Sequence, residues 1–240
     1  MADHQTIRRT GAGVGTLDID EGLRAHMNRV YGIMGVGMVV TGLVAYYAGT
    51  NANILNALFT GYMRYVIMFA PLAMVFFLGG MINRLSENAA RLAFIAFSAL
   101  VGLSISYIFA IYTGVSITQT FFTTAIAFGG LSVYGYTTKR DISGWGSFLI
   151  MGVIGLIVAS ILNIWLASSA MTFAISIIGL LIFAGLTAYD TQTIKNTYLQ
   201  MAEAGQTEWL GKAAIMGALN LYWDFLNMFM FLLHFMGGRE

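Results

Sequence analysis

Charged residues are scarce in this 240-residue chain, and cysteine is absent. Asp, Glu, Lys and Arg make up 10% of the residues, whereas an ordinary soluble domain has about 25%. The absence of cysteine excludes disulfides, thiol catalysis and cysteine metal sites. The only proline, Pro71, falls inside an apolar segment, where we expect it to kink a helix. A net charge of +1 gives no indication of a nucleic-acid partner.

Two long runs of the chain carry no charge at all, from Leu92 to Thr138 and from Ile142 to Tyr189. Each run is about twice the ~20 residues that cross ~30 Å of hydrocarbon, so each is expected to form two helices joined by a turn. The mean hydropathy of +0.75 is too high for a water-soluble domain. A β-barrel is disfavoured because the runs are continuously apolar rather than alternating. We therefore predict an all-α, polytopic membrane protein.

Polar turns divide the chain into seven expected membrane spans in one domain. A polar tail over residues 1–28 precedes the membrane domain at 29–240, and it lacks the apolar core of a signal peptide, so we expect it to be retained. The seven spans are expected at residues 29–48, 64–83, 91–112, 119–137, 146–167, 171–192 and 215–236.

Basic residues predict the orientation of these spans. Ten of the twelve fall on the side of the N-terminus, and only Arg64 and Arg239 fall on the other side. The positive-inside rule therefore places the N-terminus in the cytoplasm and, after seven spans, the C-terminus outside. If the last segment enters and returns, the C-terminus would be cytoplasmic instead. The ten are Arg8, Arg9, Arg24, Arg29, Arg84, Arg91, Lys139, Arg140, Lys195 and Lys212.

Asp190 and Asp224 are the only acidic residues inside apolar segments. Inserting a carboxylate at the centre of a membrane helix costs roughly 2.5–3.5 kcal/mol. Two such carboxylates in one chain therefore indicate a functional role. Asp190 lies about 7 Å below Lys195 at the helical rise. If Arg239 marks the outer interface, Asp224 lies within about 8 Å of the same cytoplasmic side. Arg84 falls close to this level, which predicts a cluster of two carboxylates and one guanidinium.

Such a cluster has coupled protonation, because two close carboxylates in a low dielectric cannot both ionise cheaply. Three arrangements compete: a proton shared by Asp190 and Asp224, a salt bridge from Arg84 to Asp190, or a cation held by both aspartates. Competition of this kind is what a pH-gated cation path requires. The structural alternatives are that Asp190 only ends a helix, that Asp224 is a hydrogen-bonded core residue, and that Arg84 is a topology anchor.

Three segments carry a resemblance to a known family. They are Leu23–Tyr47, LRAHMNRVYGIMGVGMVVTGLVAYY; Gly179–Lys195, GLLIFAGLTAYDTQTIK; and Ala218–Gly237, ALNLYWDFLNMFMFLLHFMG. In order and over residues 23–238, they resemble the first, sixth and closing helices of the Bax inhibitor-1 family, the transmembrane Bax-inhibitor-motif proteins, in its bacterial branch. Tyr-Asp-Thr-Gln and Leu-Tyr-x-Asp-Phe-Leu-Asn are the specific motifs.

The resemblance implies six helices packed around a central seventh, in the bacterial inner membrane. It also implies a pH-sensitive calcium leak in which Asp190 and Asp224 form the sensor and Arg84 is a latch to Asp190. Acidification would then neutralise Asp190, weaken the latch and let the helices part. Electrostatics alone also allows the opposite direction, because two ionised carboxylates repel each other. Calcium is expected as the permeant ion, and no cofactor is expected.

The rival function is a non-conducting regulator that binds a membrane protease or another integral protein. It predicts that activity maps to the N-terminal tail or the cytoplasmic loops rather than to Asp190. A proton-coupled transporter would need a further substrate site, for which the sequence offers no residues. An enzyme is not expected, since neither a Ser-His-Asp set nor an HExxH motif is present.

Overall fold

The structure is a computed structural model that describes residues 16–82, 84–205 and 207–238, and the elements in these ranges are all helical. Tail residues 1–15 and the predicted interfacial Arg239 lie outside the described residues, whereas residues 16–28 of the expected tail form the start of the first helix. The helices are α1 (Thr16–Gly49), α2 (Ala52–Phe59), α3 (Met63–Met81), α4 (Glu87–Ile105), α5 (Ile108–Ile111), α6 (Gly114–Thr137), α7 (Trp145–Leu166), α8 (Ser169–Glu203), the 3-10 turn η1 (Thr207–Trp209) and α9 (Leu210–Met236).

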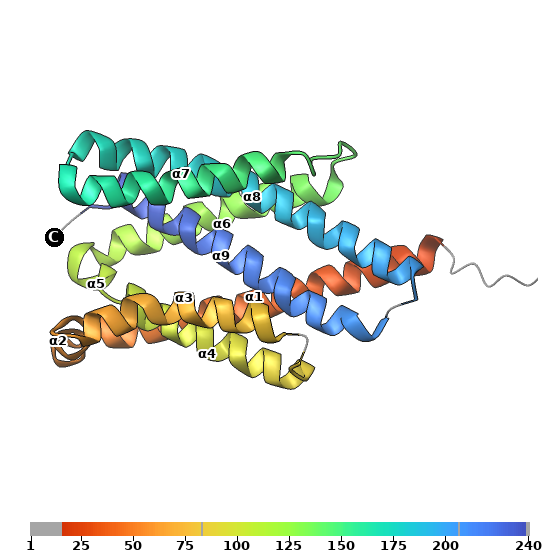
Figure 1. The fold of residues 1–240 in the computed structure, drawn as a ribbon, viewed down its shortest axis with the longest axis horizontal. Coiled ribbons are helices and arrows are strands. Elements are labelled where there is room, and N and C mark those ends of the chain that lie inside the picture. The colour runs from red at the N-terminus through yellow and green to blue at the C-terminus, as the bar shows by residue number, and fades with distance from the viewer. Residues whose placement is uncertain (1–15, 83, 206, 239–240) are drawn as a thin grey trace, which may run out of the picture.

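The long helices run side by side between two ends of a bundle (Figure 1). One end holds the start of α1 and the connections α3–α4, α6–α7 and α8–α9; we call it the basic end, because those connections contain Arg84, Lys139 and Arg140. The opposite end holds α2, α5 and the end of α9. The segments predicted to share one side of a membrane therefore share one end of the bundle.

In the part of the chain that the structure describes, six helical segments are long and apolar enough to cross a membrane. The prediction of an all-α membrane bundle is confirmed, but the count of seven is not. The missing segment is α6, which runs the length of the bundle but contains many Thr, Ser and Gly residues. Two further boundaries differ: the expected 91–112 span is interrupted between α4 and α5, and α8 continues to Glu203 instead of ending at residue 192. The six segments are Asp20–Gly49, Met63–Met81, Glu87–Ile111, Trp145–Leu166, Ser169–Glu203 and Leu210–Met236.

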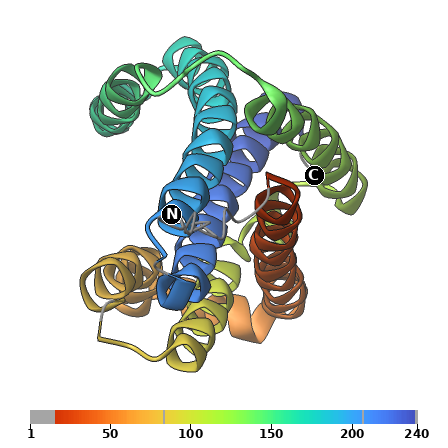
Figure 2. The same cartoon turned by 90° about the vertical axis from the view of Figure 1, so that its right-hand side faces the viewer.

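Helix α9 occupies the interior of the bundle and is the most buried of the six segments. It contacts α1, α4, α6 and α8, and the view along the bundle shows it between these helices (Figure 2). Its Tyr222 is fully buried, with its ring edge-on to Phe94 and Phe97 of α4. The Tyr222 hydroxyl lies 2.6 Å from Thr41 Oγ1 of α1. Tyr222 thus fixes the rotation of α9 about its axis.

A glycine allows α6 to approach α8 closely. A Cβ atom added to Gly135 would lie 2.3 Å from the carbonyl oxygen of Ala188, so only glycine fits there. Gly130, one and a half turns earlier on α6, has no heavy atom within 4 Å of the corresponding position. The two glycines on one helix therefore have opposite packing environments.

We expect Gly135→Ala to lower the free energy of unfolding by about 1–3 kcal/mol, because the added methyl group must push α6 away from α8. Thermal unfolding of the purified protein in detergent, followed by circular dichroism, measures the change. Gly130→Ala is the control and should be neutral or slightly stabilising, since alanine favours helix and meets no neighbour. Equal losses in both variants would contradict the close approach.

Candidate functional site

Asp190 of α8 and Asp224 of α9 lie next to each other inside the bundle, with their carboxyl groups close enough to interact. Asp224 is 3% exposed, while Asp190 is partly buried. The two residues predicted as a pair are thus brought together by two helices that are adjacent in the chain. The two carboxyls meet where α8 packs against the middle of α9.

The Asp190 and Asp224 carboxyls need a proton or a cation between them. Two ionised carboxylates have only acceptor oxygens, so a hydrogen bond between them exists only when one carboxyl is protonated. No N–H or hydroxyl group of the described residues donates to Asp224 Oδ2, although this atom is fully buried. A proton shared with Asp190 or a bound cation is therefore the counterpart that the site can offer to this oxygen.

The rotation of α9 directs Asp224 toward α8. Tyr222 precedes Asp224 by two residues, which is about 200° around a helix, and it packs against α1 and α4 on the other side. Thr41 donates its own proton to the carbonyl of Ser98 at 2.9 Å, so the Tyr222 hydroxyl is the donor to Thr41. The anchored tyrosine therefore positions the carboxyl at the interface with α8.

Close packing against α6 surrounds Asp190. Ala188 meets Gly135, and Thr191 donates a hydrogen bond to the Thr187 carbonyl and lies 3.5 Å from Ser132 Oγ. The helix continues past Asp190 to Glu203. The alternative that Asp190 only ends a helix is therefore wrong.

Arg84 lies apart from the pair. It is exposed in the turn between α3 and α4, where its N–H bonds to the Met81 carbonyl at 2.9 Å. Within residues 16–82, 84–205 and 207–238 it forms no ion pair. The latch between Arg84 and Asp190 stays a prediction.

Two α8 side chains hold the α6–α7 connection: Gln192, which the sequence did not single out, and Lys195, which it marked only as a basic residue at the membrane interface. Gln192 accepts a hydrogen bond from the Ile142 N–H at 2.9 Å and donates to the Arg140 carbonyl at 2.8 Å. Lys195 donates to the Tyr136 carbonyl at the end of α6 at 2.8 Å. In the sequence, the only sign of this role is that both side chains are polar and follow Asp190 closely. Their partners on the α6–α7 connection are known only from the fold.

A cavity of about 280 Å³ lies between α8 and α9 toward the basic end. Its lining includes Thr193, close after Asp190 on α8, and Asn220, one turn before Asp224 on α9. His26 of α1 and Ile82 after α3 also line it. Thr193 and Asn220 bring the cavity within about one turn of each aspartate along its helix, although neither aspartate lines it, and Ile82 borders it two residues before Arg84.

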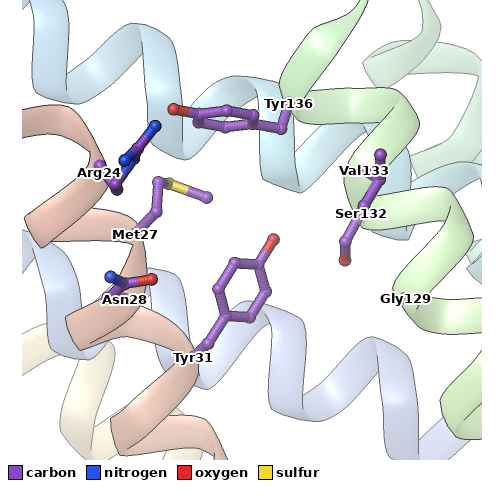
Figure 3. A pocket seen from close by; sticks show the side chains of 8 residues that line it. All are labelled: Arg24, Met27, Asn28, Tyr31, Gly129, Ser132, Val133 and Tyr136. Atoms are coloured by element: carbon purple, nitrogen blue, oxygen red, sulfur yellow. The ribbon is translucent and has the colours of Figure 1, made fainter. Parts of the chain in front are cut away.

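A second cavity, of about 300 Å³, separates α1 from α6 near the same end. The side chains of Tyr31 and Tyr136 point into it, and Arg24 lies beside the Tyr136 hydroxyl (Figure 3). Ser132 is shared between this cavity and the contact with Thr191.

The pair supplies few ligands for a metal ion. Calcium takes six to eight oxygen ligands, several of them from carboxylates. The described part of the chain contains no group of three or more His, Asp or Glu side chains that could hold a metal. The two carboxyls together have four oxygen atoms, fewer than calcium takes.

The sequence matches known proteins along most of its length. A family model described as inhibitor of apoptosis-promoting Bax1 matches residues 23–240. The inner membrane protein YbhL of Escherichia coli K12 is 46% identical over 220 residues, which cover 91% of this chain and 94% of YbhL. A protein of Caulobacter vibrioides is 43% identical over 233 residues, which cover 93% and 92% of the two chains. YrjE of Lactococcus lactis is 40% identical over 222 residues, which cover 90% and 92%.

The shared proton should be visible in the infrared spectrum. We expect an absorption of protonated carboxyl C=O at pH 7 that disappears in the Asp190→Asn/Asp224→Asn double variant. Asp141→Asn is the control: its carboxyl is exposed, and the N–H and hydroxyl of Ser143 hold the pKa of Asp141 below its usual value, so it contributes no such band. A band that persists in the double variant would contradict the shared proton.

Proposed function

The chain belongs to the family of inhibitors of apoptosis-promoting Bax1 and is an integral membrane protein, and from this premise we propose that it is a pH-sensitive leak channel for calcium or other cations. The observation that carries the proposal is the close approach of the Asp190 and Asp224 carboxyls inside the bundle, where Asp224 is buried. Carboxyls inside membrane helices commonly mark ion pathways and proton relays.

The placement in the membrane is part of the proposal. Helix α6 is the seventh span, because it runs between the two ends of the bundle (Figure 1) and carries no charged residue. The basic end faces the cytoplasm, and α9 ends on the opposite side. The relative YbhL is named an inner membrane protein, and we assign this chain to the inner membrane of a bacterium.

The gate uses the competition between a proton, a cation and Arg84 for the same carboxyls. The shared proton holds α8 to α9 in the described arrangement. A calcium ion that enters from the cavity beside Thr193 and Asn220 replaces this proton and bridges the carboxyls in passing. Ile82, two residues before Arg84, lines the same cavity. We therefore expect the Arg84 guanidinium to reach this cavity from the α3–α4 turn.

The direction of gating follows the family resemblance: acidification neutralises Asp190, releases Arg84 and opens the path. Repulsion between two ionised carboxylates acts in the other direction, at high pH. Both directions require that the pair titrates, so loss of pH dependence on removing one carboxyl is the common consequence.

We expect calcium flux into liposomes that contain the purified protein to change by about ten-fold between pH 6 and pH 8, because one proton controls the gate. Asp190→Asn should make the flux independent of pH, and Asp224→Asn should weaken or shift the dependence. Asp141→Asn, which removes an exposed carboxyl, should retain the wild-type profile. Wild-type pH response in both pair variants would refute the gate.

Absence of flux above that of empty liposomes at every pH would refute conduction itself. The remaining function would then be the non-conducting regulator that binds a membrane protease or other membrane protein. Deletion of residues 2–20 separates the two functions, because it should abolish partner capture by a regulator and leave the flux of a channel intact.

Arg84→Gln tests the latch. With the guanidinium removed, we expect the flux at pH 8 to rise toward its value at pH 6, because nothing then holds the ionised Asp190. Lys139→Gln removes an exposed positive charge from the same end of the bundle and should not change the profile. An unchanged profile in Arg84→Gln would eliminate the latch while leaving the aspartate gate standing.

A further inference from the structure

A groove of about 410 Å³ opens between α1 and α4, with two arginines at one end and an apolar floor. It is separate from the cavities beside Asp190 and Asp224. The arginine end lies toward the basic end of the bundle, because Arg91 is in the second turn of α4. The lining consists of Arg29, Gly32, Ile33, Val36, Arg91, Phe94 and Ile95.

The two arginines converge on one carboxylate oxygen. Arg29 and Arg91 both donate to Glu87 Oε1, the latter at 2.8 Å. One negative charge thus faces two positive charges, so the cluster keeps a net charge of +1. The side chains of Arg29 and Arg91 are 36% and 44% exposed. Each guanidinium has five N–H donors, and most of them remain available to a second anion at the surface.

Below the arginines the groove is apolar. Phe94 forms a buried floor, while Val36 and Ile95 are exposed at its edges. Val36 lies seven residues after Arg29, about 10 Å deeper along the helix. A Cβ atom added to Gly32 would meet no heavy atom within 4 Å, so this glycine leaves the groove open. The groove therefore has a cationic head and an apolar body in the direction of the membrane interior.

We propose that this groove binds an anionic glycerophospholipid, with its phosphate on Arg29 and Arg91 and one acyl chain along the apolar floor. The charge of the cluster is complementary to a phosphate, and paired guanidiniums are well suited to bind one. Basic pockets between membrane helices on the side of the basic loops are typical sites for anionic headgroups. The volume accommodates an acyl chain, whereas a helix is about 10 Å wide and would not enter.

The lipid would also act on the buried helix. Glu87 Oε2 occupies the space where a side chain at Gly211, at the start of α9, would begin. A phosphate that takes over the two arginines competes with Glu87, and Glu87 is the residue that joins this cluster to α9. Binding thereby reaches the helix that carries Asp224 without any contact to the aspartate pair.

Native mass spectrometry of the full chain in detergent tests the site, with phosphatidylglycerol, phosphatidylcholine or inorganic phosphate added. We expect phosphatidylglycerol to bind about five-fold or more tightly than phosphatidylcholine, because only the former has a net negative headgroup. Inorganic phosphate should not compete at equal concentration, because it lacks the acyl chain. Competition by phosphate would overturn the lipid and indicate a simple anion site.

Charge variants separate binding from structure. Arg91→Gln should weaken phosphatidylglycerol binding by about five-fold or more, whereas Lys139→Gln, with the same change in net charge, should not. Glu87→Gln removes the competing carboxylate and keeps both arginines, so lipid binding should be equal to or stronger than that of the wild type. Parallel losses in Arg91→Gln and Glu87→Gln would show a structural role only and would overturn the proposal.

A steric pair tests the groove without a change of charge. Gly32→Leu fills the groove and should abolish retention of the lipid, because its side chain takes the place of the acyl chain. Gly35→Leu places the same side chain in open space outside the groove on the same helix and should leave binding intact. Equal binding in both variants would overturn the site. If Arg91→Gln fails to fold, this pair decides alone.

Discussion

Hydrocarbon offers no hydrogen bonds, so each polar group inside a membrane bundle must find its counterpart within the protein. Most buried hydroxyls here do so: Tyr222 donates to Thr41, and Thr41 donates to the Ser98 carbonyl. Asp224 is different, because its Oδ2 is buried and receives no N–H or hydroxyl donor from the described residues. Its neighbour across the contact between α8 and α9 is the Asp190 carboxyl, another group with acceptor oxygens.

Helix α8 connects this contact to the rest of the basic end. On either side of Asp190, Ala188 packs on the backbone of α6, and Gln192 and Lys195 hold the α6–α7 connection through backbone groups. A displacement of α8 at Asp190 would therefore have to move α6 and its following loop as well. Such coupling makes two packed arrangements more accessible than a gradual deformation, since close-packed helices resist small shifts.

Positive charge at the basic end has two structural roles. Arg84 is exposed in the α3–α4 turn, two residues after Ile82, which lines the cavity between α8 and α9, whereas Arg29 and Arg91 converge on Glu87 next to the start of α9. The sequence shows the concentration of charge on one side and the four-residue spacing of Glu87 and Arg91. It does not show that Arg29 joins them, because that contact depends on how α1 lies against α4.

The sequence by itself determined that this is a helical membrane protein, because its long uncharged runs are of the length that crosses hydrocarbon. It also singled out Asp190 and Asp224, because a carboxylate inside such a run is costly. The predicted end of the sixth span at residue 192 was wrong: α8 continues to Glu203, because polar residues also form helices outside hydrocarbon. Only the tertiary structure decided that the two carboxyls meet, that Arg84 is exposed in a turn, and which face of α9 is turned toward α8. Those features depend on helix rotation, which Tyr222 and Gly135 set through contacts with residues far away in the chain.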